Sequence, residues 1–449
     1  MAVWKRILAI CGLLCCAALL FGCAPTTIDE LYCLPKRSEE VSDLQSAIDQ
    51  VMDALQYSAP RSGDNQQSVQ MVDLDGDGRM EAVLFAKGTD DSPLKILIFR
   101  LMEDSYELAD TISRMGSSFD QVEYVQMDGK PGLEMVVGRQ VSDQLVRNLA
   151  VYSFRETAVQ LMNTNYTRFL TCDLNRDMLA DIFILRPGES ETANGVTELY
   201  TFASGKLEKT SEARLSNPVA ALHRMMTANI HDGVPAVFVA SLVEQQEAMV
   251  TDIYALVDGK YTNVSLSNDS GTSIKTLRNS YLYAEDIDSD GVVELPSLLR
   301  PYTTASAAAS ESHIIRWYAM TSSGQEITKL YTYHNIPVEG GGWYLELGAD
   351  FVEDVFVVLD GETDGAKQYS FHLYDSENEV TEQLLTIYLF RGSDRAEQAV
   401  TDNRFELLRT DSVTYAARLE GASAVYGITR DSLIRSFHLI HTQWKTGVT

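Results

Sequence analysis

The feature that most constrains this chain is an acidic loop that recurs at intervals of about fifty residues. In its first copy an apolar run leads into Asp73-Leu-Asp-Gly-Asp-Gly-Arg-Met-Glu81, and a second apolar run follows. Related loops start at residues 73, 126, 173, 230 and 286, in steps of 53, 47, 57 and 56 residues. Repetition at a fixed length indicates one supersecondary unit that is copied along the chain.

Each unit reads as a group of short strands. In the first unit the strand-like runs are Val69–Val72, Ala82–Phe85, Lys95–Leu101 and Tyr106–Ser113, with clusters of Gly, Asp and Ser between them. Four strands in about fifty residues is the size of one β-propeller blade. We therefore expect a mainly β fold, with a propeller of about five four-stranded blades over residues 62–340.

The composition shifts after Gly340-Gly341-Gly342, our preferred domain boundary. Strand-like runs at 343–347, 355–359, 369–374, 384–390 and 405–408 precede an apolar helical stripe over 431–444. This pattern predicts a small α+β module over residues 341–449. Whether its first strands complete a sixth blade stays open.

The N-terminus predicts export. Lys5 and Arg6 precede an apolar stretch, Ile7–Phe21, of 15 residues, which suits a signal peptide and is shorter than the roughly 20 residues of a membrane-spanning helix. Leu20-Phe21-Gly22-Cys23 then resembles the lipobox of bacterial lipoproteins. The resemblance implies cleavage after residue 22 and a diacylglycerol or further acyl lipid on Cys23, which would anchor the chain to the extracytoplasmic face of the cell membrane. A buried helix that happens to contain cysteine is the alternative.

Residues 23–61 should form a tether followed by one helix. Val41, Leu44, Ile48, Val51, Met52 and Leu55 are spaced by three and four, which predicts an amphipathic helix with Ser38 as its cap. Removal of the signal and acylation of Cys23 leave Cys33 and Cys172 as the cysteines that could pair, so a disulfide scaffold is excluded. The formal net charge of −28 argues against a nucleic-acid partner.

The acidic loops also carry a family resemblance. The segment Val72-Asp-Leu-Asp-Gly-Asp-Gly78 resembles the calcium loop of FG-GAP or VCBS-type repeat proteins, found in integrin alpha heads. The flanking segments 30–35, 57–60 and 294–296 look like bacterial cell-envelope lipoproteins of this type. The resemblance implies a propeller with calcium loops, in a family whose members serve in adhesion, as scaffolds and as enzyme accessories.

The ligand pattern can also be argued from chemistry. With Asp73 as position 1, carboxylates stand at positions 1, 3, 5 and 9, Gly78 allows a tight turn at position 6, and Arg79 offers a main-chain carbonyl at position 7. Oxygen ligands at alternating positions suit calcium, which we expect to be structural. The expected ligands are Asp73, Asp75, Asp77, Arg79 and Glu81; Asp173, Asn175, Asp177 and Asp181; and Asp286, Asp288, Asp290, Val292 and Glu294.

The loops should differ in strength. Asn175 and Met178 should weaken the third loop, while Gln126, Lys130 and Val234 remove ligands from the copies at 126 and 230, where Lys130 could take the place of an ion. An EF-hand is excluded because position 12 lacks an acid and strands flank the loop. A metal-free acidic turn remains the alternative.

Catalytic motifs are weak. Ser92-Pro-Leu-Lys95, Thr401-Asp-Asn403 and Lys445-Thr-Gly447 resemble fragments of penicillin-binding enzymes, but Pro93 leads into a strand rather than a helix. His438 and His441 are spaced for one helix face without a nearby acid pair. We therefore expect a noncatalytic, surface-tethered binding or scaffold protein with a protein or glycan partner. A cell-envelope hydrolase or its accessory subunit is the alternative.

Overall fold

The computed structural model describes residues 39–440, apart from short segments at 104, 142–146, 191–192, 219–220, 244–247, 268–269, 279–281, 300–311, 336–341, 364–365 and 376–379. The predicted signal peptide, Cys23 and Cys33 lie outside the described residues. Within the described part of the chain, no helix is long and apolar enough to cross a membrane.

The described strands form successive antiparallel sheets. The first four contain β1 (Gln56–Tyr57), β2 (Val69–Val72), β3 (Glu81–Lys87), β4 (Leu94–Met102) and β5 (Ser105–Arg114); β6 (Ser118–Val125), β7 (Glu134–Gln140), β8 (Arg147–Phe154) and β9 (Ala158–Tyr166); β10 (Arg168–Cys172), β11 (Asp181–Arg186), β12 (Val196–Ala203) and β13 (Lys206–Arg214); and β14 (Leu222–Asn229), β15 (Pro235–Val243), β16 (Ala248–Val257) and β17 (Lys260–Asn263). The second, third and fourth sheets are four-stranded meanders. The mainly β fold and its repeated four-stranded sheet are therefore confirmed.

Two further sheets follow. The fifth contains β18 (Glu294–Leu299), β19 (Ser312–Met320), β20 (Glu326–Asn335), β21 (Trp343–Leu347) and β27 (Phe437–Leu439). The sixth has the order β22 (Val355–Thr363), β23 (Ala366–Asp375), β24 (Val380–Arg391), β26 (Val413–Leu419) and β25 (Phe405–Arg409), with the short helix α4 (Arg395–Gln398) beside it.

Consecutive sheets pack face to face, which explains why their central strands are apolar throughout. In β11, Ile182 and Ile184 face the second sheet, whereas Phe183 and Leu185 face the fourth. Side chains of a strand alternate between its two faces, so a strand that is covered on both faces needs an unbroken apolar run. The stack is thus held by one hydrophobic layer between each pair of neighbouring sheets.

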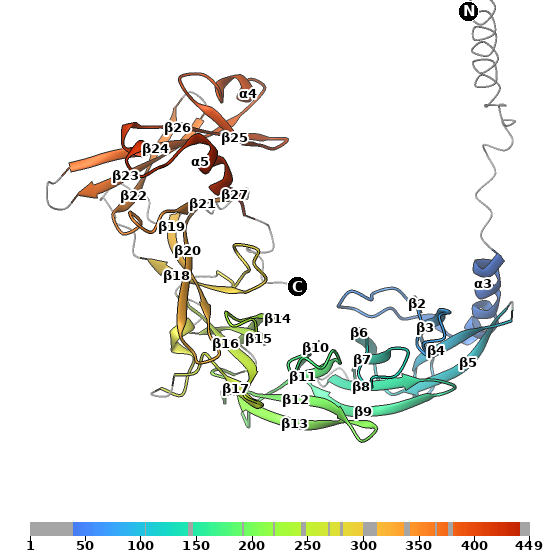
Figure 1. Cartoon of the computed structure of the whole chain (residues 1–449). Coiled ribbons are helices and arrows are strands. Elements are labelled where there is room, and N and C mark those ends of the chain that lie inside the picture. The colour runs from blue at the N-terminus through green and yellow to red at the C-terminus, as the bar shows by residue number, and fades with distance from the viewer. Residues whose placement is uncertain are drawn as a thin grey trace, which may run out of the picture.

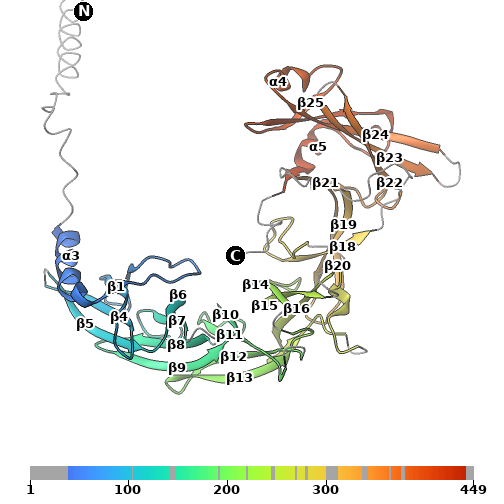
Figure 2. The ribbon, with the colours of Figure 1, turned by 180° about the vertical axis from the view of Figure 1, so that it is seen from behind.

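The sheets follow an open arc (Figures 1 and 2). In the second to fourth sheets the first strand lies on the inner side of the arc and the last strand on its outer side. Helix α3 (Glu39–Val51), continued by a 3-10 turn at Met52–Ala54, lies at one end, and the sixth sheet lies at the other. The described sheets are blade-like, but the first and fifth do not meet, so this part of the chain does not close into the propeller ring that the sequence predicts.

The helix gives a physical reason for the open ring. Ile48 is buried against Ala82, Leu84 and Phe99 of the first sheet, on the face turned away from the second sheet. In a closed propeller the last blade would cover that face. Here the amphipathic helix predicted around residues 41–55 covers it, as a capping element does at the end of a repeat array.

The C-terminal region departs from the prediction in two ways. Strand β21 pairs with β20, so the expected boundary at Gly340–Gly342 falls between two strands of the fifth sheet. The expected helix over 431–444 ends early: α5 spans Arg430–Ser436, and the next residues form β27, which pairs with β21. The tertiary pairing with β21 overrides the helical spacing of the apolar residues. Residues 441–449 lie outside the described part.

Replacing the central apolar residue of the helix tests its capping role. Ile48→Ala should lower the free energy of unfolding by about 2 to 4 kcal/mol, because it leaves a cavity against the first sheet. The exposed neighbour Gln50 provides a matched control, since Gln50→Ala removes no buried contact. Denaturant unfolding would measure both variants. Equal midpoints for the two would contradict the capping role.

Candidate metal centres

The acidic loops occupy equivalent places in the sheets. Residues 73–80, 126–133 and 173–180 form the loops between β2 and β3, β6 and β7, and β10 and β11, respectively. Residues 286–293 lead into β18 in the same way, after a bridge between Glu285 and Glu294. The corresponding connection of the fourth sheet, 230–234, is shorter. The strands predicted to flank the loops are therefore present.

A residue at position 2 fixes each loop to the core. The side chains of Leu74, Met127, Leu174 and Ile287 are all buried, and Ile230 is buried in the shorter fourth loop. The loops also bond to one another: Leu133 N–H donates to Leu74 O, Ala180 N–H to Gln126 O, and Val293 N–H to Asn229 O. The Arg176 side chain donates to Gly233 O and links the third loop to the fourth, so hydrogen bonds connect consecutive loops along one rim of the arc.

Backbone N–H groups orient the acids in a shared pattern. In the first loop Gly78 N–H donates to Asp73 and Arg79 N–H to Asp77, at 3.1 and 2.8 Å. The equivalent bonds run from Met178 to Asp173 and Leu179 to Asp177 in the third loop, and from Gly291 to Asp286 and Val292 to Asp290 in the fifth. Met178 adopts the left-handed φ of 66° that glycine holds at this position in the other two loops. A non-glycine residue is strained there.

The acid at position 9 is buried in every loop that has one. Glu81, Glu134 and Glu294 are fully buried, and each accepts a hydrogen bond from the N–H at position 2, at 2.8, 2.8 and 3.1 Å. Asp181, which is also buried, is held by Leu174 N–H. The second carboxylate oxygen of all four acids is buried and has no hydrogen-bond partner among the described residues. An unpaired buried carboxylate oxygen is costly and calls for a cation or a proton.

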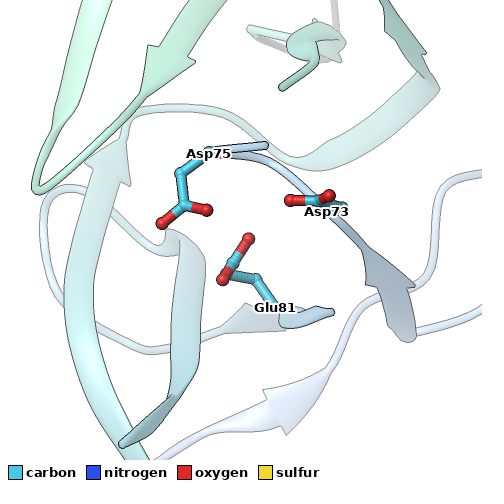
Figure 3. A group of neighbouring side chains, drawn as sticks. All are labelled: Asp73, Asp75 and Glu81. Atoms are coloured by element: carbon cyan, nitrogen blue, oxygen red, sulfur yellow. The ribbon is translucent and has the colours of Figure 1, made fainter. Parts of the chain in front are cut away.

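Two loops gather their acids into a tight group. Figure 3 shows Asp73, Asp75 and Glu81 converging on one space. Their ligand oxygens lie within 4.8 Å of one another, as do those of Asp286, Asp288 and Asp290. Asp77, Glu294 and the acids of the third loop lie outside such groups in the described chain. Asp173 of the third loop nevertheless has its own buried oxygen without a partner.

Basic side chains enter three of the loops. Arg100 Nη2 lies 2.5 Å from Asp75, and Lys329 contacts Asp290 and lies 3.8 Å from Asp288. In the second loop Arg155 Nη2 lies 3.9 Å from Glu134, while the predicted substitute cation, Lys130, binds Asp128 at 3.1 Å and stays 65% exposed. Arg155 is therefore better placed than Lys130 to replace an ion. Among the described ion pairs, none includes an acid of the third loop.

Burial and crowding raise the pKa of the position-9 acids. Burial is the main cause for all four, and it raises the pKa of Asp181 and of Glu294 to about 7. Neighbouring carboxylates add to the effect: Asp177 and Asp173 act on Asp181, and Asp288 and Asp290 act on Glu294. A bound cation would stabilise the ionised forms and reverse the shift.

These donor sets fit calcium in the first and fifth loops. Three carboxylates converge in each loop, and a hard cation such as calcium binds through oxygen ligands of this kind. Glu81 belongs to the first group, whereas the unpaired oxygen of Glu294 is buried outside the second. The third loop also fits, with Asn175 supplying an amide oxygen. The second loop does not, because Gln126 and Lys130 replace the acids at positions 1 and 5 and leave Asp128 and Glu134.

The described residues among those considered for catalysis contact other partners. Lys95 lies within β4 and pairs with Asp90 at 2.6 Å. His438 lies in β27, where its Nε2 is 3.1 Å from Glu346, and His441 lies outside the described residues.

No family model matches this chain, and no curated protein matches it either. Among solved structures, it is similar to the WD40 domain of SCAP from fission yeast, with 10% identity, a TM-score of 0.26, and coverage of 81% of this chain and 97% of that one. It is also similar to the Aleuria aurantia lectin, with 8% identity, a TM-score of 0.25, and coverage of 78% and 94%. Likenesses this distant say nothing about ligand or activity.

The raised pKa values predict that calcium binding releases protons. Because Asp181 and Glu294 stay protonated up to about pH 7 in the folded protein, whereas the unfolded chain loses these protons near pH 4, the metal-free fold should lose stability between about pH 4 and 7. Calcium binds the ionised acids, so its affinity should rise over that window. Titration calorimetry at pH 6.5 in two buffers of different ionisation enthalpy should give different heats. Identical heats would contradict the shift.

Proposed function

We propose that this chain is a membrane-anchored extracytoplasmic lipoprotein of the FG-GAP or VCBS type, in which a calcium-stabilised, propeller-like array of sheets acts as a noncatalytic binding or scaffold module. The repeated position-9 acid carries the proposal. Four buried carboxylates in equivalent places each keep one oxygen without a partner among the described residues. A cation in the first, third and fifth loops would satisfy three of them.

Calcium would act on the rigidity of the array rather than on a reaction. The loops bond to their neighbours along one rim, so an ion that locks one loop also restrains the next. At typical extracellular affinities of about 0.1 to 1 mM, each site would add about 0.6 to 1.8 kcal/mol of stability at roughly 2 mM calcium. A stiff, curved frame can then present its surface to a protein or glycan partner.

The calcium proposal is tested by neutralising the position-9 acids one at a time. Glu81→Gln and Glu294→Gln keep the acceptor for the position-2 N–H but lose the charge, so each should abolish one site and spare the other, since the loops lie more than 200 residues apart in sequence. Titration calorimetry of the chelated protein would count the sites. Thermal unfolding with and without calcium would show the matching loss of stabilisation.

Glu134→Gln is the matched control for these variants. It alters the same buried position in the second loop, where Gln126 and Lys130 replace two of the acids, so the calcium stoichiometry should not change. The proposal fails if the chelated wild-type chain binds no calcium below about 5 mM, above the usual extracellular range. Binding that survives both Glu81→Gln and Glu294→Gln at full stoichiometry would place the ions elsewhere.

The anchor is tested separately. Metabolic labelling with a palmitate analogue should modify the native chain and not the Cys23→Ser variant, because the thiol is the acyl acceptor. The variant should also leave the membrane fraction. Cys172→Ser controls for labelling at another cysteine, since Cys172 is buried in the fold. A label that persists after Cys23→Ser would overturn the lipoprotein proposal.

A further inference from the structure

A pocket of about 510 Å³ opens on the inner side of the arc. It is lined by the segment at Ser62 and Gly63, by the first halves of the inner strands β6, β10 and β14, and by Arg147 and Tyr166 of the second sheet. This volume lies within the range of small-molecule sites. The acidic loops follow the far ends of the same inner strands, so the pocket and the loops lie at opposite ends.

The charge of the pocket is opposite to that of the chain. Acids outnumber Lys and Arg by 64 to 36 in the sequence, yet the lining holds three arginines, Arg147, Arg168 and Arg224, and one acid, Asp120. Guanidinium groups that line one cavity repel each other unless anions share the space. The fold therefore concentrates positive charge where an anion can enter.

The single carboxylate of the lining is already engaged. Asp120 accepts a hydrogen bond from the Tyr166 hydroxyl at 2.5 Å and pairs with Arg147 at 3.3 Å. Arg168 is exposed, and its only described hydrogen bond goes to the backbone oxygen of Thr167. The Arg168 guanidinium thus has no carboxylate partner among the described ion pairs.

The opposite wall of the pocket is also basic. Arg224 lies over the ring of Tyr283, 5.2 Å from its centroid, and its nearest carboxylate oxygen in the described chain, from Glu285, is 3.8 Å away. Its Nη1 is buried and donates no hydrogen bond to any described residue. His223 beside it is bonded to the Tyr283 hydroxyl at 2.5 Å. Two walls of the pocket therefore present guanidinium groups that have N–H donors without an acceptor among the described residues.

We propose that this pocket binds a small anionic ligand that carries a carboxylate or phosphate group, held by Arg168 and Arg147 on one wall and by Arg224 on the other. Guanidinium groups form charge-assisted, often bidentate, hydrogen bonds to both oxyanions. This inference names the ligand class of the binding module proposed above and rests on that proposal.

Three sugars of matched size distinguish the chemistry. Glucuronate carries a carboxylate, glucose 6-phosphate carries a phosphate, and glucose carries neither. Titration calorimetry on the full chain in mild detergent should show binding of at least one anionic sugar and none of glucose. The stronger of the two anionic sugars identifies the group that the pocket prefers. Affinity should fall as sodium chloride is raised.

Variants locate the site. Arg168→Gln and Arg224→Gln should each weaken binding of the anionic sugar about tenfold, the usual effect of losing one charged hydrogen bond. Arg214→Gln is the matched control, since this exposed arginine lies on β13 at the outer side of the arc. Circular dichroism and thermal unfolding would verify that all three variants fold.

Running the titrations on both chelated and calcium-loaded protein separates this inference from the calcium proposal. Calcium binding without anion binding below about 10 mM would overturn the proposed anion site and support the calcium sites. Anion binding without calcium binding would overturn the calcium proposal and support the anion site. Equal binding of glucose and the anionic sugars, or equal effects of Arg168→Gln and Arg214→Gln, would also overturn the proposed site.

Discussion

The hydrogen bond between the acid at position 9 and the N–H at position 2 organises each loop, and the rest of the array depends on it. Glu81 begins β3 and Leu74 follows β2, so the bond closes the loop across the ends of two paired strands. It also buries the acid beside an apolar side chain that anchors the loop in the core. The free-energy cost of burying that carboxylate is offset only if a cation, a proton or an arginine neutralises its charge.

The loops differ in which group neutralises the buried carboxylate. The second uses Arg155, whose guanidinium lies near Glu134, and that loop has lost the acids at positions 1 and 5. The third brings no basic side chain from the described residues, and burial with two neighbouring acids raises the pKa of Asp181 to about 7. The first and fifth combine a cluster of acids with a cation from a later strand, Arg100 or Lys329. An ion entering these two loops competes with a resident side chain, whereas in the third it competes only with a proton.

Much of the fold follows from local sequence. The runs Val69–Val72 and Trp343–Leu347 are strands with the predicted bounds, because alternating or unbroken apolar residues between turn-forming residues leave few other options. Strand β26 was missed, since its central Ala416 and Ala417 have little strand preference of their own. They are strand residues because β24 and β25 pair with them on both sides.

The candidate metal centres could be predicted only in part from the sequence. Spacing identified the acids that face one another in the first and fifth loops, since a turn of alternating carboxylates brings them together through local geometry. Arg100, Lys329 and Arg155 could not be found in this way. The first two come from strands β4 and β20 and the third follows β8, and only the tertiary fold brings each to its loop. The sequence gives no indication of the basic pocket. Its arginines lie at 147, 168 and 224 and share no motif, and only the stacking of the sheets brings them together.

The placement of the two kinds of charge also limits how they can influence each other. The acidic loops follow the last residues of the inner strands, and the pocket lies by their first residues. Asp120, for example, lies near the start of β6, and Asp128 lies in the loop after its end. At about 3.3 Å per residue, the five-residue strand β10 separates Arg168 from the third loop by roughly 16 Å, which exceeds the screening length of about 8 Å at physiological salt. Calcium in the loops therefore adds little potential to the pocket. Any coupling between ion and anion must pass through the rigidity of the sheets, since the loop-to-loop hydrogen bonds hold the inner strands that form the pocket walls.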